Sequence, residues 1–424
     1  MDTIFALSSG APPAGIAIVR VSGPQAGPAL KALAGSAPAP RRARRAALRD
    51  GGGELLDQAL VLWFPGPNTV TGEDLAEFHL HGGRAVVAAV ETALGALPGL
   101  RRAEAGEFTR RAFANGRIDL AEAEGLADLL AAETELQRQT AIGMAAGALS
   151  RQVETWRERL LLASARVEAA LDFDDEGDVV ADTESLQRDI SGLAAEIGEQ
   201  VGAPATEVLR EGFRVALAGP PNSGKSTLFN ALLESEAAIT APYAGTTRDV
   251  LVRTVAMGGV PFTFVDMAGL RENSPDPIEA LGIGRARVEI AVADLVLWLG
   301  EEGEGPSGAW EIEPQTDRSD HRVKAAPQHR VSALTGDNMA ALRRALIEAA
   351  LTTMPKPGQV ALNRRQRDLL ADALEGLRGA QSQSDLLLVA EGLRATRLAF
   401  DRLVGRSSTE DVLDALFGRF CIGK

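Results

Sequence analysis

The chain has 424 residues, 45% of them hydrophobic, and a net charge of −14; this length suggests two or three domains with sizeable cores. The acidic balance argues against a general nucleic-acid coat, although a local basic patch could still hold one folded RNA. No apolar run approaches the roughly 18 residues of a membrane span, and residues 1–10 lack the features of a secretion signal. The single cysteine, Cys421, excludes an internal disulfide, which is typical of the reducing cytoplasm. We therefore expect a soluble, cytoplasmic, multidomain protein without a membrane segment.

Residues 1–118 combine short alternating strands, such as 16–21, with glycine-rich turns. Within them, 34–53 is rich in Ala, Pro and Gly and carries Arg41, Arg42, Arg44, Arg45 and Arg49. We interpret this arginine-rich stretch as a solvated surface loop, with an RNA-binding patch as the alternative.

A helical pattern begins at Asp119, which has the spacing of a capping box with Glu122. Apolar residues then recur at helical intervals over 153–171, and the pattern continues to about Leu209. It returns near Leu351 and runs to the end of the chain. Two further capping spacings occur there, at Asn363 with Gln366 and at Ser407 with Glu410; the last helix has an apolar face made of Val412, Leu413, Leu416, Phe417 and Phe420.

Between the helical stretches, predicted strands at 213–219, 260–266 and 294–299 alternate with helices, which indicates a parallel sheet with crossover helices. The sequence therefore predicts an α+β domain followed by an all-α domain that is interrupted by an α/β domain. The expected boundaries are 1–118, then 119–210 together with 351–424, and 211–350 for the insertion.

A complete P-loop pattern follows the first of these strands, at 219–226. Its glycines let successive backbone N–H groups point at phosphate oxygens at the start of a helix. Lys225 would place a charge on the terminal phosphates, and Ser226 would offer a hydroxyl to Mg²⁺. The predicted nucleotide contacts here are Asn222, Ser223, Gly224, Lys225, Ser226 and Thr227.

Three later segments, in this order, favour a GTPase over an ATPase. The first is 245–249, a switch loop in which a Thr hydroxyl would bind Mg²⁺. The second is the segment Asp266, Met267, Ala268 and Gly269. It would place the Asp266 carboxylate near the metal and a backbone amide near the γ-phosphate. The third, Ser332, Ala333 and Leu334, resembles a loop that lines the guanine base.

The usual guanine-reading pattern, Asn-Lys-x-Asp, is incomplete. The best candidate is 314–317, where Asp317 alone is kept and would pair with the guanine N1 and amino groups. A base edge that is read only in part costs discrimination, so we expect weak guanine selectivity. The alternative is that Asp317 is a solvated loop residue.

Several motifs together resemble the MnmE (TrmE) family of tRNA-modification GTPases over nearly the full length. They are 2–4 with 15–24, 71–77 with 81–83, 106–113, and the C-terminal Cys421, Ile422, Gly423 and Lys424. The resemblance implies GTP hydrolysis coupled to adding an aminomethyl or carboxymethylaminomethyl group at the wobble uridine of certain tRNAs. It also implies a flavoprotein partner, MnmG (GidA), a one-carbon unit from formyl-tetrahydrofolate, and a homodimer formed by the amino-terminal domains.

The family resemblance implies a potassium-stimulated reaction. Leu270 stands where many small GTPases have a water-positioning Gln. K⁺ would instead be bound by the Asn222 amide oxygen, the carbonyls of Ala241 and Tyr243, and the Thr246 hydroxyl. The loop around the ion would also contact the nucleotide, and Thr247 would then remain for Mg²⁺; these predicted contacts are Ala241, Pro242, Tyr243, Ala244, Gly245, Thr246 and Thr247. Glu279 would orient the attacking water, with Glu272 as the alternative.

The resemblance also assigns four folate contacts: Arg20, Glu77, Arg117 and Lys424. A carboxylate such as Glu77 can accept two N–H bonds from a pterin-like ring, and cations suit the glutamate tail of the ligand. Cys421 is either a nucleophile or a small buried group, and its role stays open. Two other classes of protein compete with this reading: an Era-like regulatory GTPase switch in RNA or ribosome assembly, and a scaffold whose G domain has decayed.

Overall fold

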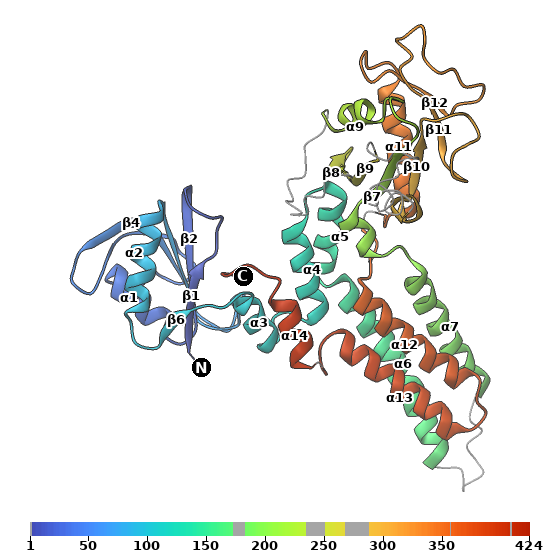
Figure 1. Ribbon diagram of the computed structural model, residues 1–424. Coiled ribbons are helices and arrows are strands. Elements are labelled where there is room, and N and C mark those ends of the chain that lie inside the picture. Colours follow the sequence, from blue (N-terminus) through green and yellow to red (C-terminus); the bar gives the residue numbers. More distant parts are fainter. Residues whose placement is uncertain (1, 173–182, 235–250, 268–287, 357, 408) are drawn as a thin grey trace, which may run out of the picture. The chain divides into compact units, whose positions relative to one another are not determined.

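The computed structural model describes residues 2–172, 183–234, 251–267, 288–356, 358–407 and 409–424 (Figure 1). The chain forms two compact units. The first unit comprises Met1–Ala127, Leu149–Glu154 and Arg397–Lys424, and the second comprises Asp128–Ala148 and Thr155–Thr396. Each is described by itself.

A six-stranded sheet with the order β3-β4-β5-β2-β1-β6 forms the centre of the first unit. All neighbouring strands are antiparallel except β1 and β6. The strands are β1 (Thr3–Leu7), β2 (Ala14–Ser22), β3 (Arg44–Arg49), β4 (Leu55–Phe64), β5 (Leu75–Gly82) and β6 (Leu100–Arg102). Alternate residues of β2, β4 and β5 are buried under α1 (Ala26–Ala34) and α2 (Arg84–Gly95) (Figure 1). The strand predicted at 16–21 is confirmed as part of β2.

The prediction of a loop throughout 34–53 is wrong in part, because 44–49 form β3. Ala46 and Leu48 are buried in the sheet core while Arg45 and Arg49 project into solvent. In this edge strand, buried apolar residues alternate with exposed ones. The many arginines made the segment look like a solvated loop, so the sequence did not predict the strand.

The helices of the first unit that follow the sheet are α3 (Glu107–Ala114), α4 (Leu120–Ala131) and α14 (Glu410–Phe417). The part of α4 up to Ala127 belongs to this unit. They share an apolar core that includes Leu120, Leu416 and Phe417. The capping box at Asp119 and Glu122 is confirmed, because each side chain accepts a 2.8 Å hydrogen bond from the other residue's backbone N–H.

Two details of the last helix differ from the prediction. Its N-cap is Thr409, not Ser407, and the cap side chain makes no hydrogen bond to the helix. Val412 is 37% exposed, whereas Leu413, Leu416, Phe417 and Phe420 are buried as predicted. The buried face is therefore narrower than the apolar pattern suggested.

The second unit contains a six-stranded sheet with the order β12-β11-β10-β7-β9-β8, parallel except for the β8–β9 pair. Its strands are β7 (Phe213–Ala218), β8 (Leu251–Met257), β9 (Val260–Asp266), β10 (Leu295–Trp298), β11 (Trp310–Glu313) and β12 (His329–Arg330). The three predicted strands are confirmed as β7, β9 and β10. Helices α9 (Lys225–Leu233) and α11 (Met339–Thr353) pack on one face of this sheet.

The prediction of crossover helices fails at one edge of this sheet. Residues 299–309 and 314–328 connect β10 to β11 and β11 to β12 without a helix. On the face opposite α11, Ala309 of the first connection and Trp298 of β10 pack against a cluster that includes Val296. Hydrogen bonds of the buried residues Glu313 and Lys324 also hold these connections to the sheet.

Further helices with described bounds are α5 (Glu135–Ala145), α6 (Ala148–Asp172), α7 (Thr183–Gly202), α8 (Thr206–Glu211), α12 (Arg364–Gln381) and α13 (Leu386–Leu403). Within the second unit, α7 and α12 run side by side (Figure 1). The predicted amphipathic face of α6 is confirmed by Trp156, Leu160 and Val167, each at most 1% exposed. The capping box at Asn363 and Gln366 is confirmed as well. Among the described residues, no helix combines the length and hydrophobicity of a membrane span.

Candidate functional site

The P-loop joins the end of β7 to the start of α9, as the strand–turn–helix pattern predicted. Gly219, Asn222 and Gly224 have φ angles of 147°, 61° and 91°, so the chain curls through conformations that favour glycine. Helix α9 begins directly after Gly224, and no side chain caps its first turn. Its free N–H groups and the positive end of its dipole are therefore available to a phosphate.

Lys225 is held inside this turn. Its side chain is 6% exposed, and Nζ donates hydrogen bonds to the carbonyls of Gly219 (2.9 Å) and Pro220 (2.7 Å). Burial lowers the pKa of Lys225, while the charge of Asp266 acts in the opposite direction. Asp266 ends β9 and is 2% exposed. The structure thus places the predicted phosphate-binding cation and the predicted metal-proximal carboxylate close enough to interact.

Asp317 and Ser332, which the sequence assigned separately to base binding, are brought together. The Ser332 hydroxyl donates a 2.5 Å hydrogen bond to Oδ1 of Asp317, and Ser332 is fully buried. Asp317 itself is exposed, so its carboxylate is fixed on one side and open on the other. Ala333 packs at the edge of the core, and Leu334 is 79% exposed.

Gln315 is a neighbour of the P-loop that the sequence analysis missed as a contact. It has a φ of 56°, and a Cβ at Gly224 would lie 3.1 Å from Gln315 Nε2. Gln315 occupies the second position of the incomplete Asn-Lys-x-Asp pattern, so its place in that pattern was the available signal.

Part of the predicted nucleotide site lies outside the described residues. This holds for the switch residues Ala241, Pro242, Tyr243, Ala244, Gly245, Thr246 and Thr247, for Ala268, Gly269 and Leu270, and for Glu272 and Glu279. Their roles stay predictions. Asn222, Ser226 and Thr227 are described and exposed, Ser223 is half-buried, and Met267 is buried.

Two predicted folate contacts, Arg20 and Glu77, form an ion pair in the first unit. Arg20 Nε and Nη2 donate to Glu77 Oε1 at 3.1 and 2.9 Å, across the β2–β5 pair. His79 Nε2 lies 3.1 Å from the other oxygen, Oε2. Hydrogen bonding with His79, and then the Arg20 charge, lowers the pKa of Glu77. The Arg20 guanidinium lies over the Phe108 ring, with its Cζ 6.0 Å from the ring centroid. The sequence did not predict this contact.

The C-terminal tail docks at the end of β1, the strand that pairs with β2. Ile422 forms an antiparallel bridge with Ala105, and a Cβ at Gly423 would lie 2.0 Å from the Leu7 carbonyl. Gly423 is buried, Lys424 is half-buried and Cys421 is exposed. The exposed thiol does not fit the alternative of a buried, inert cysteine. Arg117 is exposed, and its side chain passes close to Gly72.

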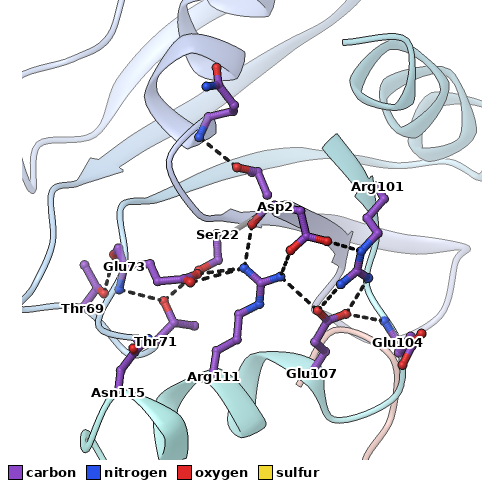
Figure 2. Close-up of polar contacts among 12 residues, drawn as sticks. Asp2, Ser22, Thr69, Thr71, Glu73, Arg101, Glu104, Glu107, Arg111 and Asn115 are labelled. Atoms are coloured by element: carbon purple, nitrogen blue, oxygen red, sulfur yellow. Dashed lines mark hydrogen bonds and ion pairs between the residues drawn. The ribbon is translucent and has the colours of Figure 1, made fainter. Parts of the chain in front are cut away.

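An ion-pair network holds α3 over the same face of the sheet. Figure 2 shows Asp2, Glu73 and Glu107 around the Arg111 guanidinium. Arg111 donates to Asp2 at 2.8 Å, to Glu107 at 3.0 Å and to Glu73 at 3.2 Å. Although burial opposes it, hydrogen bonding by Arg101 and Arg111 lowers the pKa of Glu107. Together these contacts fix the start of the chain and α3 beside Ser22, two residues from Arg20 on the same face of β2.

Comparisons with known proteins agree with the motifs. Residues 3–117 match the family described as the GTP-binding protein TrmE N-terminus, and 120–421 match the MnmE helical domain. The tRNA modification GTPase MnmE of Erythrobacter litoralis is 61% identical over 424 residues, covering 100% of both chains. That of Novosphingobium aromaticivorans is 59% identical over 436 residues, again covering 100% of both.

Among solved structures, the G domain of T. maritima FeoB aligns with 32% of this chain and 98% of its own, at 22% identity and a TM-score of 0.25. A TM-score this low supports no argument about this chain. The family matches and the full-length relatives do: they show that the chain belongs to the MnmE family of tRNA modification GTPases.

Proposed function

We propose that this chain hydrolyses GTP in the cytoplasm. With the flavoprotein MnmG, that hydrolysis drives addition of an aminomethyl or carboxymethylaminomethyl group to the wobble uridine of certain tRNAs. The observation that carries the hydrolase part is the P-loop, where buried Lys225 lies at the start of α9 and interacts with Asp266. Wobble-uridine analysis of tRNA from a strain lacking the gene tests the whole proposal, because unmodified uridine is the expected result.

The residues of the P-loop suit a nucleotide with Mg²⁺. Ser226 presents an exposed hydroxyl at the first turn of α9, and the Asp266 carboxylate lies at the end of the adjacent strand β9. Both are hard oxygen donors, as this cation requires. Bound Mg²⁺ would neutralise charge on the phosphates, while Lys225 holds the terminal phosphate and the N–H groups of the loop orient it. Thr247 completes the proposed Mg²⁺ ligands, and Glu279 orients the attacking water.

Potassium stimulation is our first prediction. Asn222 lies on the exposed turn of the P-loop with a left-handed φ of 61°, and its amide oxygen is the proposed ligand of a cation beside the phosphates. Replacing Na⁺ by K⁺ should raise GTP turnover at least about tenfold, because we propose that the loop oxygens fit the larger ion and so hold its charge where an arginine finger would act. Asn222→Ala should remove most of that rise, measured as phosphate release. Equal turnover in the two salts would refute the role of K⁺.

Guanine reading through Asp317 is the second prediction. A carboxylate held by Ser332 can accept hydrogen bonds from guanine N1 and the amino group. Asp317→Asn should weaken GTP binding at least about tenfold and improve binding of xanthosine triphosphate, whose carbonyl suits an amide donor. Competition titrations check this. We also expect weaker rejection of other purine nucleotides than in a complete Asn-Lys-x-Asp site. Unchanged GTP affinity in Asp317→Asn would favour a solvated loop residue.

We also propose that formyl-tetrahydrofolate binds the first unit through Arg20, Glu77, Arg117 and Lys424, in a homodimer. Glu77 is 15% exposed and already aligned by Arg20 and His79, so an ordered carboxylate faces the ligand. The proposed domains remain 1–118, 119–210 with 351–424, and 211–350. An Era-like switch would hydrolyse GTP equally well, so the tRNA assay above separates the two functions.

A further inference from the structure

The loop that carries Asp317, residues 314–328, is fastened to the sheet by charged groups rather than by a helix. Lys324 is 1% exposed, and its Nζ donates to the carbonyl of Trp298 (2.8 Å) and to Glu311 Oε2 (2.5 Å). A buried ammonium with two acceptors anchors the far end of the loop beside β10 and β11.

Glu313, the last residue of β11, anchors the near end. It is 4% exposed, and Oε2 accepts hydrogen bonds from the Lys324 backbone N–H and from Arg330 Nε, each at 3.1 Å. Its other oxygen, Oε1, lies 3.1 Å from His321 Nε2. One buried carboxylate thus contacts the loop at two places and β12 at a third.

His321 lies between two acceptors. Its Nδ1 is 2.6 Å from the carbonyl of Arg318, and its Nε2 faces the Glu313 carboxylate. A carbonyl and a carboxylate can only accept, and a neutral imidazole has one N–H; both contacts are hydrogen bonds only when the ring is an imidazolium. The Arg318 carbonyl and then Glu313 raise the pKa of His321 above 6.5, against a small opposing effect of burial.

The other charges near His321 do not change this assignment. Asp317 and Asp320 on the loop add negative charge, and Asp320 is paired with the Arg318 guanidinium at 2.8 Å. The cations nearby are already paired: Arg322 with Glu301, Lys324 with Glu311 and Arg330 with Glu313.

The His321 contact closes the segment that presents Asp317. Residue 318, whose carbonyl His321 binds, directly follows Asp317, and its N–H donates to the Gln315 carbonyl at 2.9 Å. Gln315 in turn lies against Gly224 of the P-loop. The segment 315–318 is therefore held by Gly224, by the buried Ser332, by the Val331 carbonyl, which accepts a 3.3 Å hydrogen bond from the Thr316 N–H, and by the His321 imidazolium.

We propose that His321, in its imidazolium form, is a positioning residue that fixes the Asp317 carboxylate for the nucleotide base, so that nucleotide affinity decreases when His321 loses its proton. This inference rests on the proposed base-reading role of Asp317. In this chain, His321 would thus hold the segment that carries Asp317 in place without the Asn and Lys of a complete Asn-Lys-x-Asp pattern.

The direction of the pH effect follows from the raised pKa. The contribution of the His321 contacts to the stability of the folded loop is complete below the ordinary pKa of 6.5. It is lost as pH rises through the higher pKa of His321 in the folded protein. Because GDP binding needs the Asp317 carboxylate in the position that the imidazolium holds, full-length protein should bind GDP more tightly at about pH 6 than at about pH 9, by roughly tenfold.

Calorimetric titration of GDP into three variants and the wild type tests the inference. His321→Leu, which has no donor, should bind weakly at every pH. His321→Arg, which keeps a permanent cation with several donors, should bind tightly at every pH. His329→Leu is the matched control. His329 lies on neighbouring β12, with its ring centroid 5.5 Å from that of Trp310, and this variant should keep the wild-type change of GDP affinity with pH. Ionisation of the GDP phosphate and of guanine N1 adds the same pH dependence to all four proteins, so their affinities are compared with one another at each pH.

Parallel pH profiles for the wild type and His321→Leu would overturn the inference. The proposed function fails in a different way. If Asp317→Asn binds GDP as well as the wild type, Asp317 does not read the base. If GDP does not bind at any pH, the nucleotide site itself is wrong.

Discussion

Replacing Lys225 with methionine should reduce GTP turnover by about a thousandfold or more, since it removes a preorganised cation from the phosphate site. The side chain is almost completely buried and held by the carbonyls of Gly219 and Pro220, so no other lysine can take its place. Methionine keeps the apolar stem and length of the side chain. The fold should therefore persist, and thermal unfolding should show a melting temperature close to that of the wild type.

Lys356→Met is the matched control, because Lys356 is exposed in the second unit and only its backbone makes a hydrogen bond in the described structure. It should turn over GTP at the wild-type rate. Phosphate release under saturating GTP and K⁺ measures both variants. Turnover by Lys225→Met within tenfold of the wild type would mean that the P-loop is not where the phosphates bind.

Local patterns predicted the elements whose signals are contained in a few neighbouring residues. The strand at 260–266 lies where predicted, and every residue of it is buried. The caps at Asp119 and Asn363 form because donor and acceptor are three residues apart in one chain segment. Such features do not depend on how the rest of the chain folds.

Features that depend on tertiary contacts were missed. Ser407 has the spacing of a helix cap, yet α14 starts after Thr409 and is fixed instead by Arg110, which pairs with Glu410 and Asp414. Strands β11 and β12 are short and polar, and buried charges such as Glu313 take the place of an apolar layer. No periodicity signals a charge that is paired across a loop.

The candidate site shows the same division. Asp317 and Ser332 could each be identified from their positions after the P-loop, but the hydrogen bond between them joins residues 15 apart in sequence. Likewise Arg20 and Glu77 were assigned separately to ligand contacts, whereas they bind each other across β2 and β5. Motif matching identifies the residues, and only the fold shows which of them act as pairs.

The docking of the C-terminal tail allows a sharp test of the folate proposal. Gly423 is buried with a φ of 99°, and any side chain there would meet the backbone of Leu7 and Ser8. Gly423→Val should therefore expel the tail from the edge of the first sheet without disturbing the buried face of α14. Because Lys424 is the next residue, it would lose its place near the strands that carry Arg20 and Glu77.

We expect Gly423→Val to weaken folate binding by at least about tenfold, which is the loss of one charged contact, and to abolish tRNA modification. GTP hydrolysis by the isolated protein should change less than about twofold, since the P-loop belongs to the other unit. Arg419→Ala, an exposed change in the same segment, is the control and should leave folate affinity intact. Calorimetry with formyl-tetrahydrofolate decides between the outcomes. Unchanged folate affinity in Gly423→Val, together with lost modification, would place Lys424 outside the pocket, and the tail would then be explained better as a contact for MnmG or tRNA.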